Sequence, residues 1–374
     1  MSSSKKNNKK DHSSKSLSSS VNPNAAQQFL QKKKKERSVE DFVKGIIKGN
    51  RTILSQAITL VESTKPSDQI KTQKIIEACL AYSGNSIRIG ITGIPGVGKS
   101  TFIEALGKHV ISQKRKVAVL AIDPSSSVTK GSILGDKTRM NDLSLEKNAF
   151  IRPSPAGSSL GGVARKTRET ILLCEAAGFE TIFVETVGVG QSETAVHSMV
   201  DFFLLPLVPG AGDELQGIKR GIVEMADILA VNKADGDQLE AAKNARREYR
   251  NALHLMPLKE SGVNPKVLTC SAIEQTGIEE IWKLILENQK LTKRNKFFYK
   301  KRKMQSLFWL HEQIRNGLKD FFYKNEKIRM RLEEIEKEVL EGKRNSFSAA
   351  DELLNMFFQS TGEFIRLDKK EKHI

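Results

Sequence analysis

The sequence predicts an α/β fold centred on a doubly wound, mostly parallel sheet, and three patterns along the chain indicate it. From Ile87 to about Gln289, short apolar runs typical of buried strands alternate with amphipathic helical segments. Before and after this stretch, apolar residues recur at the helical spacing of three and four. These patterns divide the chain into a basic arm at residues 1–38, a helical region at 39–85, a sheet domain at 86–290 and a helical extension at 291–374.

The composition is that of a large globular protein. With 374 residues, of which 39% are hydrophobic, the chain can bury a full core. Its longest apolar run, Phe202 to Val208, is too short to cross a bilayer, so we expect no membrane segment. Cys79, Cys174 and Cys270 stand apart, without the spacing of a disulfide or metal site. This pattern fits a reducing compartment, and we expect the cytoplasm.

The net charge of +17 is concentrated in two segments. Residues 1–38 hold ten Lys or Arg and two acidic residues, and Lys293 to Lys303 hold seven bases and no acid. The first segment is of low complexity, which predicts a disordered, solvated arm; weak contact with RNA or an acidic partner is the alternative. Its single arginine and lack of an apolar stretch argue against a targeting peptide. The second segment is expected in a solvent-facing linker.

The first strand of the sheet domain, Ile87 to Ile91, leads into a glycine-rich loop and then a helical pattern. The loop and the first helical residue are Gly93, Ile94, Pro95, Gly96, Val97, Gly98, Lys99, Ser100 and Thr101. Glycines let successive backbone N–H groups face a polyphosphate, while Lys99 can reach the β and γ oxygens and Ser100 can hold Mg²⁺. An ordinary strand–turn–helix corner is the alternative, but it has no use for Lys-Ser in this register. The loop predicts a P-loop NTPase sheet.

A second loop predicts which base is bound. The apolar run Asp227 to Val231 ends in Asn232, Lys233 and Asp235. The carboxylate of Asp235 can accept from both N1–H and the N2 amine of guanine, a pairing that adenine does not offer, while Asn232 and Lys233 would brace the loop. A surface turn is the alternative for this tetrapeptide alone.

A third loop strengthens the prediction of a guanine nucleotide. The run Val267 to Cys270 is followed by residues placed to offer backbone contacts to the base, and Gly277 opens the next helix. Three loops in order after three buried strands favour GTP over ATP. The residues of this third loop are Ser271, Ala272 and Ile273.

Two more predicted strands end in carboxylates. Lys116 to Ile122 ends at Asp123, and Thr181 to Val184 ends at Glu185. In an open parallel sheet the ligand lies beyond the carboxyl ends of the strands, so both side chains would lie near Ser100 and its Mg²⁺. For Asp123, capping of the following segment is an equal alternative. Glycines at 188 and 190 permit a loop that senses the γ-phosphate.

Several longer strings resemble one family. ETVGVGQSE at Glu185 to Glu193, GSILGDKTRM at Gly131 to Met140, and PGAGDELQGIKRG at Pro209 to Gly221, with Arg152–Pro155 and Leu160–Ala164, resemble the methylmalonyl-CoA mutase-associated GTPases of the MeaB/ArgK type. The resemblance runs from about Val39 to the C-terminus. It implies a GTP-hydrolysing chaperone of an adenosylcobalamin-dependent acyl-CoA mutase, which gates cofactor loading and protects or reactivates the mutase, with slow hydrolysis that the partner stimulates.

The resemblance also implies roles for single residues. Asp123, Asp136 and Glu185 correspond to acidic residues around the metal, and Gln216 and Lys219 belong to a third switch loop. Catalysis of phosphoryl transfer rests on positioning and charge neutralisation, which Lys99 and the loop amides supply. Three residues are open as candidates for orienting the attacking water: Asp123, Asp136 and Gln191. The wording at Ser154 to Leu160 departs slightly from the family pattern.

The C-terminal extension carries apolar stripes on a predicted helical pair. On spacing alone, these stripes could equally pack against the rest of the chain or form a dimer interface. The resemblance favours a homodimer. The residues of the stripes are Leu307, Leu310, Ile314, Leu318 and Phe321, then Ile328, Leu332, Ile335 and Val339.

Two rival functions remain open. One is a P-loop kinase linked to arginine and ornithine transport. The other is a GTP-regulated protein that binds nucleic acid through its basic arm, although we do not expect nucleic acid as a partner. The sequence also leaves open which mutase is served, since methylmalonyl-CoA and isobutyryl-CoA mutases share the same cofactor.

Overall fold

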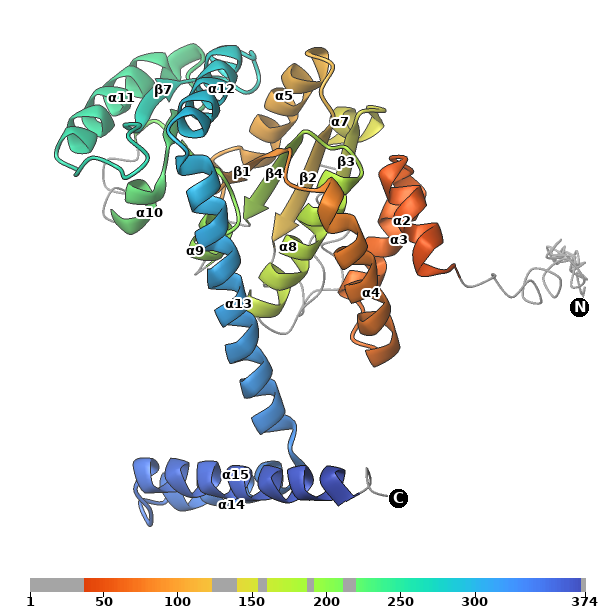
Figure 1. The fold of residues 1–374 in the computed structure, drawn as a ribbon. Coiled ribbons are helices and arrows are strands. Elements are labelled where there is room, and N and C mark those ends of the chain that lie inside the picture. The colour runs from red at the N-terminus through yellow and green to blue at the C-terminus, as the bar shows by residue number, and fades with distance from the viewer. Residues whose placement is uncertain (1–36, 123–139, 154–159, 187–191, 211–219, 371–374) are drawn as a thin grey trace, which may run out of the picture.

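A computed structural model describes residues 37–122, 140–153, 160–186, 192–210 and 220–370. A central sheet carries helices on both faces, with α2 to α4 at one side, and α13 leaves the domain to reach a separate pair of helices, α14 and α15 (Figure 1). The carboxyl ends of β2 and β4 point to the side on which α13 extends (Figure 1). The described helices include none with the length and apolarity that crossing a bilayer requires.

The sheet has seven described strands in the order β3-β2-β4-β1-β5-β6-β7, and every pair is parallel. This confirms the predicted doubly wound fold. The strands β3 and β5 were not named from the sequence, although the apolar run that forms β5 was noted. Continuous apolar runs form the strands because both faces of the sheet are covered. The strands are β1 Ile87–Ile91, β2 Val117–Ile122, β3 Ala149–Arg152, β4 Thr181–Thr186, β5 Phe202–Leu207, β6 Ile228–Val231 and β7 Lys266–Thr269.

The helices cover the sheet in two layers, each with its own apolar core. One core joins α2 to α4, α8, α9 and α11 to the sheet, and the other joins α5, α7 and α12 to its opposite face. The helical elements are α2 Val39–Ile47, α3 Arg51–Glu62, α4 Pro66–Cys79, η1 Leu80–Tyr82, α5 Lys99–Ser112, α7 Asn141–Leu145, α8 Leu160–Ala176, α9 Ser192–His197, α10 Arg220–Met225, η4 Gly236–Gln238, α11 Leu239–His254, α12 Ile278–Arg294, α13 Phe297–Lys324, α14 Glu326–Leu340 and α15 Ser346–Lys370.

Pro206 lies inside β5, a position that normally excludes proline from a central strand. Pairing of β5 with β1 ends at Leu204, so the missing N–H of Pro206 deprives no strand of a partner. The carbonyl of Pro206 faces Gly93 of the glycine-rich loop, where a Cβ atom would lie 2.8 Å from that oxygen. Gly93 is therefore required by the close approach of two backbones.

The basic segment Lys293 to Lys303 is helical and not the linker that its charge predicts, since it spans the end of α12 and the start of α13. Five of its seven cations are exposed, as expected, but Lys301 and Arg302 are partly buried against the sheet domain. The guanidinium of Arg302 donates to both carboxylate oxygens of Asp201, at 2.7 and 2.6 Å, and to the carbonyls of Gly84 and Ser86. The prediction failed for Arg302 because these partners lie about one hundred and two hundred positions away in the chain.

A second ion pair lies beside this one. Arg88 on β1 donates to both carboxylate oxygens of Glu175 on α8, at 2.9 and 2.8 Å, and both side chains are buried. Burial by itself disfavours the charged form of Glu175, but the hydrogen bonds and charge of Arg88, with the charge of Arg302, hold its pKa below the ordinary value. Burial likewise opposes ionisation of Asp201, and Arg302 reverses that effect, so the pKa of Asp201 is also lowered. The cluster is therefore fully charged at neutral pH.

Three further side chains of α13 hold the short segment that follows α9. The Gln305 amide donates to the carbonyl of Val200 at 2.8 Å, the Trp309 indole donates to that of Ser198 at 3.2 Å, and Lys301 donates to that of Asp201 at 2.9 Å. These carbonyls lie between the end of α9 and the start of β5. We call this set of contacts the α13 clasp.

The helices α14 and α15 pack on each other around a small core. Their buried apolar side chains include Ile328, Ile335, Leu353 and Phe357, and Phe322 at the end of α13 packs against them. The outward face of α13 stays apolar and exposed. Its exposed residues are Met304, Leu307, Phe308, Leu310, Ile314, Leu318 and Phe321.

We predict that Arg302→Gln strongly destabilises the protein. The change leaves the buried carboxylate of Asp201 without its bidentate partner, a loss that typically costs about 3–5 kcal/mol of unfolding free energy. Lys300→Gln is the matched control, because Lys300 is 62% exposed and pairs with Glu260 on the surface, so its loss should cost no more than about 0.5 kcal/mol. Urea unfolding of both variants measures the difference, and equal midpoints would contradict the importance of the cluster.

Candidate nucleotide site

The glycine-rich loop curls between β1 and α5, where all of the residues predicted to bind phosphate lie together. Gly96 and Gly98 have φ of 81° and 86°, a left-handed conformation that glycine adopts without strain. Lys99 is buried in the first turn of α5, and its ammonium donates to the carbonyls of Gly93 at 2.7 Å and Ile94 at 3.0 Å. The lysine thus sits under the loop, at a helix N-terminus that favours an anion.

The loop after β6 is joined to the phosphate loop through Asn232, whose side chain is 2% exposed. Its amide nitrogen donates to the carbonyl of Val97 at 2.9 Å, and its amide oxygen accepts from the backbone N–H of Ala272 at 3.1 Å. Asn232 therefore links the loops that follow β1, β6 and β7. Lys233 is exposed and has φ of 59°, so the chain turns sharply there and brings Asp235 back toward the third loop.

Asp235 is oriented by its neighbour in the third loop. The Ser271 hydroxyl donates to a carboxylate oxygen of Asp235 at 2.5 Å and accepts from the backbone N–H of Glu274 at 3.1 Å. Because both hydrogen bonds fix the Ser271 hydroxyl, that hydroxyl in turn holds the Asp235 carboxylate in one orientation. The side chain of Ile273 is 78% exposed, so only its backbone is placed to serve this loop.

Next to the ends of β1 and β4, a hydroxyl from the first turn of α5 meets a carboxylate. The Ser100 hydroxyl donates to Glu185 at 3.4 Å, and Glu185 is 8% exposed at the end of β4. Hydroxyl and carboxylate oxygens are the donors that Mg²⁺ prefers, so these residues fit that ion. Beside them, the hydroxyls of Thr92 and Thr186 lie 2.7 Å apart and join the ends of the same two strands.

Comparison with known proteins identifies the family. The model of the family described as "Methylmalonyl Co-A mutase-associated GTPase MeaB" matches residues 54–327. The chain belongs to the MeaB family. It is accordingly a P-loop GTPase, and the expected resemblance is confirmed.

Relatives from bacteria and animals resemble the chain over most of its length. It is 47% identical to a putative GTPase of Caulobacter vibrioides over 83% of this chain and 95% of the relative, and 47% identical to the GTPase ArgK of Escherichia coli over 78% and 88%. It is 43% identical to the methylmalonic aciduria type A homolog, mitochondrial, of Mus musculus over 87% and 80%. A crystal structure described as LAO/AO transport system kinase is similar, with a TM-score of 0.69, 37% identity, and coverage of 86% of this chain and 97% of that one.

Some residues expected at a MeaB-family site lie outside the described residues. They are Asp123, Asp136, Gln191, Gln216 and Lys219, together with the glycines at 188 and 190. Within the described part of the chain, no three His, Cys, Asp or Glu side chains gather as a metal site. The described half of the proposed magnesium site is thus Ser100 and Glu185.

The structure adds residues to the MeaB-family site that the sequence analysis did not select. Thr92 and Thr186 join the two strand ends, and Pro206 forces a glycine at the start of the phosphate loop. Their position at strand ends was the only signal in the sequence, and it does not reveal which neighbouring strand each will touch. Cys270 also lies here, but burial raises the pKa of its thiol to about 12, which leaves it protonated and unreactive.

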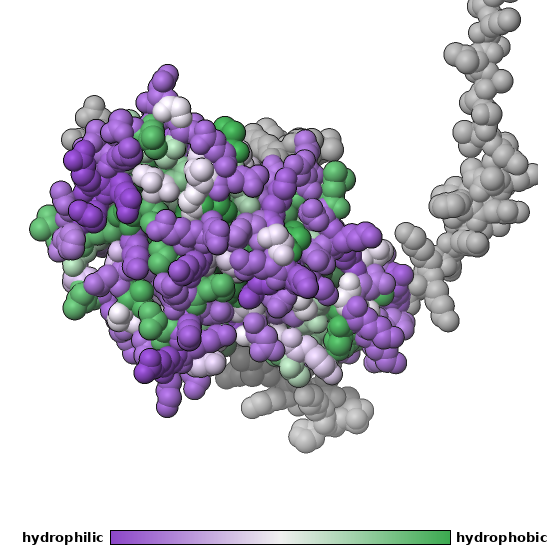
Figure 2. All heavy atoms as spheres, turned by 90° about the horizontal axis from the view of Figure 1, so that it is seen from above, coloured by the Kyte–Doolittle hydropathy of each residue, from purple (hydrophilic) through white to green (hydrophobic). Residues whose placement is uncertain are grey.

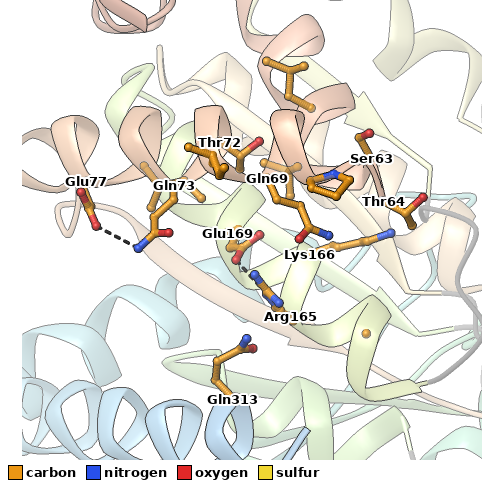
Figure 3. Close-up of a pocket in the computed structure, with 16 residues that line it drawn as sticks. Ser63, Thr64, Gln69, Thr72, Gln73, Glu77, Arg165, Lys166, Glu169 and Gln313 are labelled. Atoms are coloured by element: carbon orange, nitrogen blue, oxygen red, sulfur yellow. Dashed lines mark hydrogen bonds and ion pairs between the residues drawn. The ribbon is translucent and has the colours of Figure 1, made fainter. Parts of the chain in front are cut away.

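One well-formed cavity lies elsewhere. About 570 Å³ in volume, it is bounded by α3, α4, α8 and α13, and no residue of the three loops lines it (Figure 3). Its charged groups are already engaged: Arg165 donates to Glu169 at 3.0 Å, and Lys166 donates to the carbonyl of Glu62 at 2.7 Å. Because its charged groups are engaged within the protein and none of the three loops lines it, this cavity is not the nucleotide site.

We predict that Asp235→Asn weakens GTP binding and improves binding of xanthosine triphosphate. The carboxylate would no longer accept from the N1–H and the exocyclic amine of guanine, and a bidentate pair of this kind discriminates by about 1–3 kcal/mol, or about 5- to 150-fold. Asp237→Asn, an exposed change two residues away, is the control. Calorimetric titration with both nucleotides measures the exchange, and an unchanged ratio of affinities would refute the role of Asp235.

Proposed function

We propose that this protein is a GTP-dependent chaperone of an adenosylcobalamin-dependent acyl-CoA mutase, with methylmalonyl-CoA mutase as the first candidate. It would gate loading of the cofactor and protect or reactivate the mutase. The observation that carries the proposal is the MeaB-family match over residues 54–327. Relatives named methylmalonic aciduria type A homolog, from Mus musculus and Caenorhabditis elegans, support the link to this metabolism.

The proposed hydrolysis relies on positioning and charge. Lys99 and the loop amides would stabilise the charge that develops on the transferred phosphoryl group. Ser100 and Glu185, with Asp123 and Asp136, would hold Mg²⁺, which when bound neutralises charge on the phosphate oxygens. Orientation of the attacking water falls to Asp123, Asp136 or Gln191. Hydrolysis would be slow until the mutase completes the site, in which we include Lys219 of the third switch loop.

The α13 clasp offers a route from the nucleotide to the C-terminal helices. Glu185 and Thr186 at the end of β4 precede α9 in the chain, and the segment after α9 is held by Lys301, Gln305 and Trp309. A change in α9 would therefore alter the backbone that α13 contacts. By linkage, if the nucleotide changes the affinity of α13 for a partner, that partner changes the affinity for the nucleotide by the same factor.

A second copy of the chain is the proposed cover for the exposed apolar face of α13. Seven exposed apolar side chains between Met304 and Phe321 gather on that helix, and contiguous exposed apolar surface commonly marks an interaction site. Together with the family resemblance, they support a homodimer built through the C-terminal helices.

The test uses the purified protein and the adenosylcobalamin-dependent mutase encoded by the same genome. We expect the mutase to accelerate GTP hydrolysis, and we expect its affinity for the protein to differ between the GDP state and a non-hydrolysable GTP state. Phosphate release and calorimetry measure the two quantities. Equal mutase affinity in both nucleotide states, with no acceleration, would overturn the chaperone proposal while leaving the GTPase in place.

One observation favours a second candidate function. The similar solved structure described as LAO/AO transport system kinase suggests transfer of the γ-phosphate to a transport component. Labelling with γ-³²P GTP separates the two functions, because a chaperone releases free phosphate whereas a kinase leaves a labelled protein. We expect free phosphate only.

We predict that Gln305→Leu lowers mutase-stimulated hydrolysis and leaves hydrolysis by the free protein within about twofold. The change removes a buried donor to the Val200 carbonyl, and residues that transmit coupling commonly modulate it by about 0.5–2 kcal/mol, or about 2- to 30-fold. Gln313→Leu is the matched control, since Gln313 lies two turns further along α13 and lines the cavity of Figure 3. Equal stimulation of both variants would rule out the clasp as the route.

A further inference from the structure

An open groove of about 530 Å³ runs along the edge of the sheet at β7. The strand β7 is the last in the sheet and pairs with β6 alone. The helices α11 and α12 lie on opposite faces of the sheet, since α11 packs with Val267 in one core and α12 packs with Leu268 in the other. Residues of both helices line this one groove, so it must cross the unpaired edge of β7.

The groove has an apolar floor and a basic rim. Leu253, Val267, Leu268 and Leu284 contribute apolar surface. Just beside them, Leu255 and Leu258 are 87% and 81% exposed, among the most exposed large apolar side chains of the described residues. Exposed apolar surface that is bordered by charged residues commonly marks a binding site.

The rim carries more positive than negative charge. Arg246, Arg250 and Lys266 line the groove, and Glu280 is the one acidic residue among the described lining residues. Arg246 and Arg250 lie about one turn apart on α11, and within the described part of the chain no hydrogen bond or ion pair engages either guanidinium. A groove with free guanidinium groups on its rim complements an acidic ligand.

The groove is separate from the nucleotide site. It includes Lys266, Val267 and Leu268 of β7, but Ser271, Ala272 and Ile273 of the base-binding loop are not among its described lining residues. Seen from above, the molecule is mostly hydrophilic, with hydrophobic side chains scattered among the hydrophilic ones (Figure 2). The elements that line the groove, α11, α12 and β7, lie well away from α14 and α15 (Figure 1).

We propose that this groove binds an extended peptide segment of a partner protein, which adds as a strand to β7 and presents apolar side chains alternating with Asp or Glu. An unpaired edge supplies backbone hydrogen bonds, and alternate side chains of an added strand face the two walls. The apolar side chains would contact Leu253 and Leu284, and the acidic ones would pair with Arg246 and Arg250. No Phe, Tyr or Trp is among the described lining residues to stack a base, so single-stranded nucleic acid fits less well.

The test uses the full-length protein and pools of fluorescent nonapeptides. The first pool has Val, Ile, Leu or Phe at odd positions and Asp or Glu at even positions, and the second has Lys or Arg at the even positions. We expect the protein to bind the acidic pool at least tenfold more tightly than the basic pool in fluorescence anisotropy. Proline at two consecutive central positions of the acidic peptides should abolish binding, because one of the two lost N–H groups faces β7 in either register.

Two charge-reversed variants complete the test. Arg246→Glu with Arg250→Glu should lower affinity for the acidic pool at least tenfold. Lys243→Glu with Arg247→Glu makes the same charge change on the same helix outside the groove, where these side chains contact Glu240 and Asn244, and should change affinity less than twofold. GTP binding by both variants checks that they are folded.

Three outcomes would overturn the proposal. The first is no binding of the acidic pool at 150 mM salt, which would mean that Lys266 only guards a short edge strand against association. The second is equal loss with both charge-reversed variants. The third is tighter binding of a nine-nucleotide oligothymidylate than of the acidic pool, which would identify the patch as a nucleic-acid surface.

Discussion

The nucleotide site depends on one buried amide, that of Asn232, which holds three loops at fixed separation. Its nitrogen donates to the loop after β1 and its oxygen accepts from the loop after β7. Among side chains of this size, only an amide offers a donor and an acceptor on the same planar group. An unpaired buried backbone group would cost about 1–3 kcal/mol, so the loops stay joined. The part of the site that contacts phosphate and the part that reads the base are thereby kept in one geometry.

A second constraint comes from buried charge at the base of α13. Asp201 and Glu175 stay ionised because Arg302 and Arg88 surround them, and separating these groups would leave charges buried without partners. The first half of α13 therefore belongs to the sheet domain, although the helix continues far beyond it (Figure 1). This attachment holds the first half of α13 where the α13 clasp contacts the backbone carbonyls between α9 and the start of β5.

The molecule thus presents distinct surfaces in different directions. The carboxyl ends of the strands and the outward part of α13 lie on one side, where nucleotide chemistry and the proposed contacts with a second copy would meet (Figure 1). The groove at β7 lies at the edge of the sheet. Its basic rim belongs neither to the nucleotide site nor to the proposed contact with a second copy. A protein arranged in this way can hold a regulatory partner without obstructing the nucleotide.

The sequence by itself determined most of the strands and the phosphate loop, because both are encoded by residues close together in the chain. A run such as Ile87 to Ile91 is apolar throughout since both faces of its strand are covered, and Lys99 follows its glycines at a fixed spacing. The four-residue strand β3 was not predicted because it is short and ends in an arginine. Only the tertiary structure decided that Arg302 is buried on Asp201, that Asn232 joins three loops, and that α11 and α12 open a groove across β7. Those features arise from contacts between distant parts of the chain. The local pattern of apolar and charged residues does not encode which distant residues will come into contact.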